Sequence, residues 1–345
     1  MRAAVLRAGE IVVRDDVPDP VPAFGQVLVE VKACGICGSD LHFARHGEAM
    51  LAANDEMEGM PDFGDLRLDL ARDVFMGHEF AAEVLEAGPD TAAPAPGTIV
   101  TSVPVVLTEA GVRNLAYSNE MPSGYGERML LSAGLLAEVP NGLDPRQAAL
   151  TEPTAVGLHA VNRSRIAEGE GALVLGCGPV GLAVVAVLAQ RGIEPIAAAD
   201  PSPGRRALAG ALGAHEVVDP AAEPAFDAWA RTGGGRPLVV YEAIGVPGII
   251  HDVLRRAPAR TRLLVVGVCM ERDSFNPYHG IAKELTIEFS MAYDPVEFGS
   301  CLRSIAEGEL DMTPMITGEV DLDGVPGAFD LLARPDEHCK IMVVP

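Results

Sequence analysis

The chain of 345 residues has few basic residues and no long apolar run, and these shortages exclude several classes of protein. Its 26 basic residues face 49 acidic ones, and the formal net charge of −23 argues against nucleic acid or an anionic membrane surface as a partner. The apolar run at 180–189 is too short for the roughly 20 residues that a membrane-spanning helix needs. No signal peptide is evident at the N-terminus. We therefore expect a cytoplasmic protein whose six cysteines are thiols or metal ligands rather than disulfides.

Reactive side chains are instead gathered in one short stretch that runs from Cys34 to His42. Its sequence, Cys-Gly-Ile-Cys-Gly-Ser-Asp-Leu-His, follows a strand-like apolar run. A Cys-x-x-Cys pair alone fits half of a structural zinc site, a redox dithiol or two small core residues. The other cysteines are scattered singly, which disfavours a four-thiolate site, and the context does not suggest a thioredoxin-like βαβ unit. A further interpretation fits better: Cys37 is one ligand of a catalytic zinc that later residues complete.

Two later motifs supply candidate ligands, Gly-His78-Glu79 and Thr-Glu152-Pro. Together with the first stretch, they resemble the zinc-dependent medium-chain dehydrogenases, of the alcohol, sorbitol and threonine dehydrogenase type. The resemblance implies a catalytic zinc bound by Cys37, His78 and Glu152, with Glu79 as an adjacent ligand or catalytic group. Glu152 stands where alcohol dehydrogenases often have cysteine, which points to the polyol branch. Whether Glu79 or Glu152 completes the ligand set stays open.

The spacing of apolar segments predicts an α/β fold with two kinds of domain. Up to residue 152, short β segments broken by Gly and Pro favour an irregular antiparallel β barrel, and the resemblance implies a GroES-like catalytic domain. Over 153–288, strands alternate with helices, which predicts a doubly wound parallel sheet, the Rossmann NAD-binding domain. By resemblance, the segment 289–345 returns to the catalytic domain. The strands expected in the Rossmann domain are 172–176, 195–199, 215–218, 238–242, 262–267 and 285–289.

A glycine motif, Gly176-Cys-Gly178-Pro-Val-Gly181, follows one of these strands and opens a helix. Gly176 makes the turn, Gly178 lets the backbone approach a pyrophosphate, and Gly181 lets the helix pack on the strand. Asp200 ends the next strand, where its carboxylate would accept hydrogen bonds from the adenosine ribose and repel a 2′-phosphate. NAD is therefore expected rather than NADP. The further candidates for cofactor contact are Pro179, Val180, Arg205, Gly245 and Val268.

The resemblance also implies a proton path and groups that support the metal ligands. Ser39 would take the proton of the alcohol and pass it, through a ribose hydroxyl of the cofactor, toward His42. Asp40 would accept a hydrogen bond from the ring of His78 and fix its tautomer. Lys340 would neutralise Asp40 and so tie the C-terminal tail to the active site.

Two segments depart from the family pattern. Residues 43–76, which include the acidic, Met-rich run 54–65, form a longer connection than usual, and we expect a solvated surface loop or, alternatively, a lid or subunit contact. Residues 104–123 contain no cysteine, so we expect one catalytic zinc and no structural zinc.

The function predicted from these features is hydride transfer between NAD and a secondary alcohol or polyol, or the matching ketone or aldehyde. Family habit implies a homodimer or homotetramer. One rival is a zinc-free reductase of the same superfamily that acts on double bonds or quinones. The other is a non-catalytic NAD-binding protein that keeps the fold without turnover.

Overall fold

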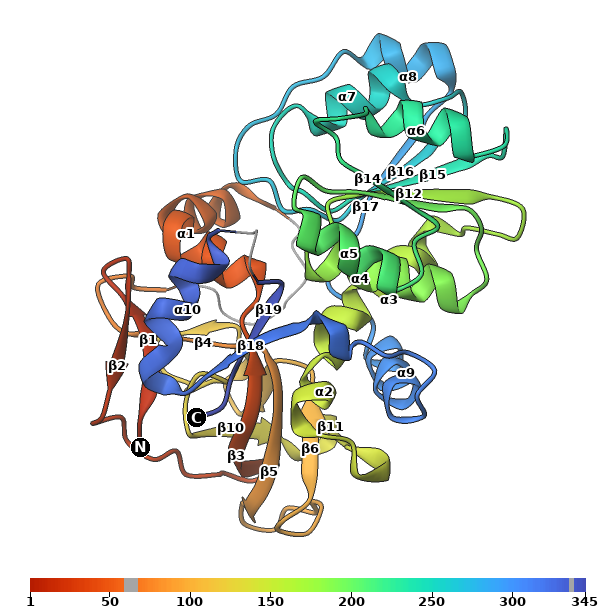
Figure 1. Ribbon diagram of the computed structural model, residues 1–345. Coiled ribbons are helices and arrows are strands. Elements are labelled where there is room, and N and C mark those ends of the chain that lie inside the picture. The colour runs from red at the N-terminus through yellow and green to blue at the C-terminus, as the bar shows by residue number, and fades with distance from the viewer. Residues whose placement is uncertain (59–67, 335–337) are drawn as a thin grey trace.

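The computed structural model describes residues 1–58, 68–334 and 338–345, which form two lobes (Figure 1). One lobe holds both ends of the chain, and the other is formed by its middle part. None of the helices in these residues is long and apolar enough to span a bilayer.

The lobe that holds the chain ends is built from mostly antiparallel sheets. The largest has the order β11-β6-β5-β3-β19-β18 with β10 also on β3, a second has the order β2-β1-β4-β9, and β7 pairs with β8. Only β18 and β19 run parallel among these described pairs. The strands are β1 (Ala3–Arg7), β2 (Glu10–Arg14), β3 (Gln26–Gly35), β4 (Val74–Met76), β5 (Glu79–Ala87), β6 (Ile99–Ser102), β7 (Val105–Thr108), β8 (Gly111–Asn114), β9 (Tyr117–Ser118), β10 (Arg128–Ser132), β11 (Leu136–Glu138), β18 (Ile316–Val320) and β19 (Lys340–Val343).

Strand β3 is the centre of this lobe because it pairs with three other strands, β5, β10 and β19. Its side chains alternate between the two faces of the sheet. Val27, Val29 and Val31 are buried in the core, whereas Glu30 and Lys32 are partly exposed on the opposite face. The strand ends at the Cys-Gly-Ile-Cys stretch, so the sheet carries that stretch into the interior of the lobe.

Helix α1 (Gly38–Glu56) corrects the prediction of a surface loop over residues 43–76. Asp40 accepts a hydrogen bond from the backbone N–H of Cys37 and so stabilises the first turn. The residues that follow are rich in Ala, Leu and Met, which favour helix over loop. The rest of the acidic run 54–65 falls largely on residues 59–67, which lie outside the described residues.

The second lobe contains a six-stranded parallel sheet with the order β14-β13-β12-β15-β16-β17. This is the doubly wound arrangement expected from the alternation of strands and helices. The strands are β12 (Gly171–Leu175), β13 (Ile196–Ala199), β14 (Glu216–Val218), β15 (Leu238–Glu242), β16 (Arg262–Val265) and β17 (Thr286–Phe289). The helices are α4 (Pro179–Gln190), α5 (Pro203–Ala211), α6 (Ala225–Thr232), α7 (Ile249–Arg256) and α8 (Pro277–Lys283).

Both faces of this sheet are covered, which explains why its strands appear in the sequence as continuous apolar runs. Along β12, Ala172 and Val174 join the apolar cluster that includes α4, whereas Leu173 and Leu175 join the cluster on the other face. All five residues of β12 are buried.

Two segments connect the lobes. Helices α2 (Pro145–Ala149) and α3 (Thr151–Ser164) lead from the first lobe into the second. After β17, the chain forms α9 (Pro295–Ala306), β18, α10 (Val325–Leu332) and finally β19, which lies between β3 and β18. The tail therefore contributes two strands to the first lobe. The predicted domain boundaries themselves stay predictions.

Candidate active site

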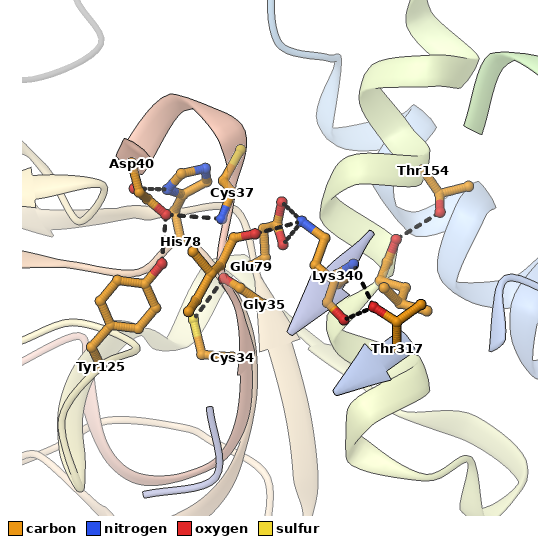
Figure 2. Close-up of polar contacts among 12 residues, drawn as sticks. Cys34, Gly35, Cys37, Asp40, His78, Glu79, Tyr125, Thr154, Thr317 and Lys340 are labelled. Carbon is orange, nitrogen blue, oxygen red and sulfur yellow. Dashed lines mark hydrogen bonds and ion pairs between the residues drawn. The ribbon is translucent and has the colours of Figure 1, made fainter. Parts of the chain in front are cut away.

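Three potential metal ligands meet where β3 ends and β5 begins. The ligand atoms of Cys37, His78 and Glu79 all lie within 4.8 Å of one another (Figure 2). Cys37 precedes the first turn of α1, His78 directly precedes β5, and Glu79 is the first residue of that strand. The tight turn before His78 needs a glycine because Gly77 has φ +103°, and a Cβ there would lie 2.8 Å from the backbone N of Tyr125. The fold therefore brings His78 and Glu79 next to Cys37, although they follow it in the sequence by at least 41 residues.

Glu79 is completely buried and forms an ion pair with Lys340, which is also completely buried. Lys340 Nζ donates to both carboxylate oxygens at 2.7 and 2.6 Å, and to the carbonyl of Ile36 at 3.0 Å. Burial disfavours the ammonium, but the charge of Glu79 outweighs this effect and raises the pKa of Lys340. The prediction that Lys340 neutralises Asp40 is therefore wrong: its partner is Glu79. A Cβ at Gly35 would collide with the Glu79 carboxylate, so this glycine makes room for the pair.

Asp40 is held by other groups and faces His78. One carboxylate oxygen accepts from the Tyr125 hydroxyl at 2.6 Å and from the Cys37 N–H at 3.0 Å. The other oxygen lies 3.5 Å from His78 Nδ1, and neither atom has a hydrogen-bond partner among the described residues, so the orienting role of Asp40 stays a prediction. Burial disfavours the imidazolium of His78, but Asp40 and Cys37 outweigh it and raise the pKa of His78 well above its ordinary value. With Nδ1 directed at Asp40, Nε2 is the ring nitrogen left for a metal.

Glu152 lies in the first turn of α3 and is buried, but it is not part of the three-residue group within the described chain. Burial raises the pKa of its carboxyl group. The charges of His78 and Lys340 act to lower this pKa, which shows that both residues are close to Glu152. Glu152 therefore lies near the group of Cys37, His78 and Glu79 without being part of it. The hydroxyl of Tyr293 faces Glu152, and burial raises the pKa of that phenol well above its ordinary value.

The two residues of the expected proton path lie on the first turns of α1. Ser39 and His42 are three positions apart, so they occupy one face of the helix, and both are partly buried. Burial lowers the pKa of His42, and the nearby His46 and Arg45 add to this effect. The resulting neutral imidazole can accept a proton.

Three tyrosines surround these groups, of which Tyr117 and Tyr125 are buried and Tyr293 is partly buried, and the sequence motifs gave no sign of the first two. Tyr117 packs edge-on against the His78 ring with 6.4 Å between ring centroids, and it stacks on Phe43 at 4.1 Å. The Tyr125 hydroxyl donates a hydrogen bond to Asp40, and Tyr293 faces Glu152. A tyrosine between two glycines, as at 124–126, indicates a tight turn, but nothing in the sequence shows where its hydroxyl points.

In the second lobe, the glycine motif forms a tight loop between β12 and α4. Gly176 has φ +91°, and a Cβ at Gly181 would collide with the Gly176 carbonyl, so both positions require glycine. A Cβ at Gly178 would meet no protein atom within 4 Å. Protein packing therefore does not require glycine at position 178, and the backbone there borders open space. Pro179 and Val180 open the helix directly after it, so their N-terminal turn faces the same space.

Asp200 follows β13 and belongs to the same loop cluster. One of its oxygens accepts from Cys177 N and the other from Ser202 N, each at 2.8 Å. Arg206 donates to the Asp200 carbonyl at 2.7 Å and lies 3.3 Å from the Asp219 carboxylate. Arg205, in contrast, keeps a buried Nε without a partner among the described residues.

Gly245 and Val268 lie against each other beyond the ends of β15 and β16. Gly245 has φ +73°, and a Cβ there would come within 2.6 Å of the Val268 carbonyl. Val268 keeps about half of its surface exposed, at 52%. Both residues therefore lie at the carboxyl edge of the parallel sheet, where such folds bind their ligands.

Comparison with known proteins identifies the family. Residues 23–141 match the alcohol dehydrogenase GroES-like domain, and residues 179–307 match the zinc-binding dehydrogenase domain. The (R,R)-butanediol dehydrogenase of Bacillus subtilis (strain 168) is 30% identical over 344 residues, which cover 96% of each chain. The chain belongs to the zinc-dependent medium-chain dehydrogenases.

Other members of this dehydrogenase family agree with that assignment. The sorbitol dehydrogenase of Rattus norvegicus is 26% identical over 94% of this chain and 90% of its own. The crystal structure of 2R,3R-butanediol dehydrogenase from Bacillus subtilis superposes with a TM-score of 0.82 at 29% identity, covering 100% of this chain and 99% of that one. A zinc-binding dehydrogenase structure from Sinorhizobium meliloti 1021, bound to NADP, has a TM-score of 0.82 at 28% identity, with coverage of 100% and 99%. The predicted fold class, a GroES-like domain with a Rossmann domain, is confirmed.

Proposed function

We propose that this dehydrogenase transfers a hydride between a secondary alcohol or polyol and NAD, with one zinc ion at Cys37, His78 and a glutamate. The observation that carries this proposal is the convergence of a thiol, an imidazole and a carboxylate within 4.8 Å. This donor set suits zinc, which is borderline-soft and binds Cys, His and Glu in catalytic sites that keep one position open. A zinc ion bound there would polarise the alcohol oxygen and lower its pKa toward neutrality.

The ligand set includes one of two carboxylates. Glu79 belongs to the group, although Lys340 already donates to both of its oxygens. Each carboxylate oxygen has a second lone pair, so the ion pair does not prevent metal binding. Glu152 is buried nearby and would serve as the exchangeable ligand when water or substrate leaves. Both glutamates therefore remain in the proposal.

For the cofactor, the carboxylate of Asp200 favours NAD over NADP, because it would bind ribose hydroxyls and repel a 2′-phosphate. The engagement of Arg206 with Asp200 and Asp219 supports this choice, since its guanidinium is occupied by the protein. Arg205 would contact the ribose. The space beside Gly178 and the free N–H groups at the start of α4 suit the pyrophosphate.

The remaining roles follow from the positions on α1. Ser39 would accept the proton of the alcohol as its own proton moves, through a ribose hydroxyl of the cofactor, toward His42, one turn further on. His46 is exposed and would not take part in this path. Tyr117 would close one side of the site and exclude water from it.

The protein is further expected to be a cytoplasmic homodimer or homotetramer with one zinc per chain and no structural zinc. In support of association between copies, β17 is an edge strand of its sheet, and Phe289 and Met291 at its end are 67% and 70% exposed. Light scattering on the purified protein would measure the mass of the assembly.

The decisive experiment measures metal content by mass spectrometry in the wild type and in Cys37→Ser. We expect about one zinc per chain, lost in the variant, together with NAD-linked oxidation in a screen of secondary alcohols and polyols. Cys301→Ser is the control, because Cys301 is buried among apolar residues at α9 and should not affect the metal. Two zinc ions per chain would contradict the single site. Absence of zinc from wild-type protein would support the zinc-free reductase or the non-catalytic protein.

A further inference from the structure

The carboxylate of Asp40 uses its two oxygens differently. Oδ2 accepts two hydrogen bonds, from the Tyr125 hydroxyl at 2.6 Å and from the Cys37 N–H at 3.0 Å (Figure 2). Oδ1 is buried and has no hydrogen-bond partner among the described residues, but it lies 3.5 Å from His78 Nδ1, which is also buried and unpartnered. Among the described residues, the imidazole is therefore the group that Oδ1 faces. The direction in which Oδ1 points depends on how firmly Oδ2 is held.

Tyr125 is fixed independently of its hydroxyl. Its N–H donates to the Met76 carbonyl at 3.1 Å, and the preceding Gly124 N–H donates to the Gly77 carbonyl at 2.9 Å. Its ring packs edge-on against Phe329 of α10, with 6.1 Å between centroids, and only 1% of the residue is exposed. The turn that carries Tyr125 is therefore hydrogen-bonded to the backbone immediately before His78. Burial also raises the pKa of Tyr125, so the phenol keeps its proton and acts as the donor.

We propose that Tyr125 is a positioning residue for metal binding: its hydroxyl fixes the Asp40 carboxylate so that Asp40 accepts the Nδ1–H of His78 and directs Nε2 to the metal. The proposal rests on the proposed function, because it assumes that His78 is a ligand. The chain Tyr125–Asp40–His78 joins the 125 turn, helix α1 and the start of β5. A histidine ligand whose other nitrogen donates to a carboxylate is held in one tautomer and one orientation. Here a phenol fixes that carboxylate in turn.

A purely structural role for Tyr125 makes a different prediction. If only the ring matters, Tyr125→Phe keeps the packing on Phe329 and leaves the metal site unchanged. If the hydroxyl positions Asp40, the same variant leaves one buried oxygen with a single donor, and the carboxylate can rotate away from His78. Metal affinity should then fall on the order of 10-fold, the lower end of what outer-sphere changes cause.

The experiment compares Tyr125→Phe with Tyr241→Phe. Tyr241 is a matched control because it is equally buried and its hydroxyl makes one 2.7 Å hydrogen bond, to Ser164, in the second lobe. Zinc affinity of each apoprotein is measured by competition with a chelating dye. The tautomer of His78 is read by ¹⁵N NMR in the apoprotein at a pH above the raised pKa of its imidazolium, where the ring is neutral, and the signals are assigned with a His78→Gln variant. We expect a roughly 10-fold weaker affinity and a mixture of tautomers in Tyr125→Phe alone.

The possible outcomes separate the two proposals. Wild-type protein that binds no zinc contradicts the proposed function, whatever the variants do. Tight zinc binding by the wild type with the same affinity and tautomer in Tyr125→Phe overturns the role of the hydroxyl. An equal loss in both phenylalanine variants would mean that any buried phenol stabilises the site only through the fold. In a double-mutant cycle with Asp40→Asn, additive losses would also overturn the proposal, because Tyr125 must act through Asp40.

Discussion

Replacement of Lys340 by Met tests how strongly the tail stabilises the first lobe. Lys340 and Glu79 have no exposed surface, and the ammonium contacts both carboxylate oxygens and the Ile36 carbonyl. The variant leaves Glu79 as a buried charge without its counter-ion, and such losses cost about 3–5 kcal/mol. We expect a decrease of that size in the free energy of unfolding, measured by urea denaturation of metal-free protein.

A surface ion pair provides the control for this measurement. Arg146 also contacts two carboxylates, Asp144 and Glu319, but its side chain is 46% exposed and theirs are 40% and 48% exposed. Because water screens exposed pairs, Arg146→Ala should lower the free energy of unfolding far less than Lys340→Met does. A loss in Lys340→Met as small as that in Arg146→Ala would refute the reasoning from burial.

A double variant tests whether charge, rather than packing, causes the loss. Glu79→Gln combined with Lys340→Met removes both charges and keeps most of the volume. The unfolding free energy should then fall by less than the sum of the two single losses, because no unpaired charge remains. Additive losses would show that the two side chains do not depend on each other.

Two further predictions concern the cofactor and the proton path. Asp200→Ser should raise the ratio of kcat/KM with NADP to kcat/KM with NAD, because it removes the charge that would repel a 2′-phosphate; an unchanged ratio would contradict the assignment. Ser39→Ala should lower the rate of alcohol oxidation on the order of 100-fold or more while the Kd for NAD, from fluorescence titration, stays the same. An equal loss of rate and of NAD affinity would argue against a proton path through Ser39.

The second lobe could be predicted well because its sheet is buried on both faces. Segments such as 172–176 and 238–242 are continuous apolar runs, and the structure forms strands β12 and β15 there. The glycine motif could also be recognised from the sequence, because Gly176 and Gly181 occupy positions that have no room for a larger residue. Local chain geometry determined both features.

The pattern of residues 43–56 was misread because the family spacing indicated an insertion, and insertions are commonly loops. The helix propensity of this Ala-rich sequence pointed the other way, and helix α1 follows that local signal. The partner of Lys340 was predicted wrongly for a different reason. Lys340 contacts a residue 261 positions earlier in the chain, and two carboxylates, those of Asp40 and Glu79, were available as partners. Residue types alone cannot choose between them, whereas the space left by Gly35 does.

The C-terminal tail links the two candidate sites through adjacent residues. Cys339 is buried in the apolar cluster of the second lobe that also contains Cys177 of the glycine loop. The next residue, Lys340, begins β19 in the first lobe and holds Glu79 beside Cys37 and His78. One peptide bond therefore connects the apolar packing beside the glycine loop to the ammonium group that pairs with Glu79.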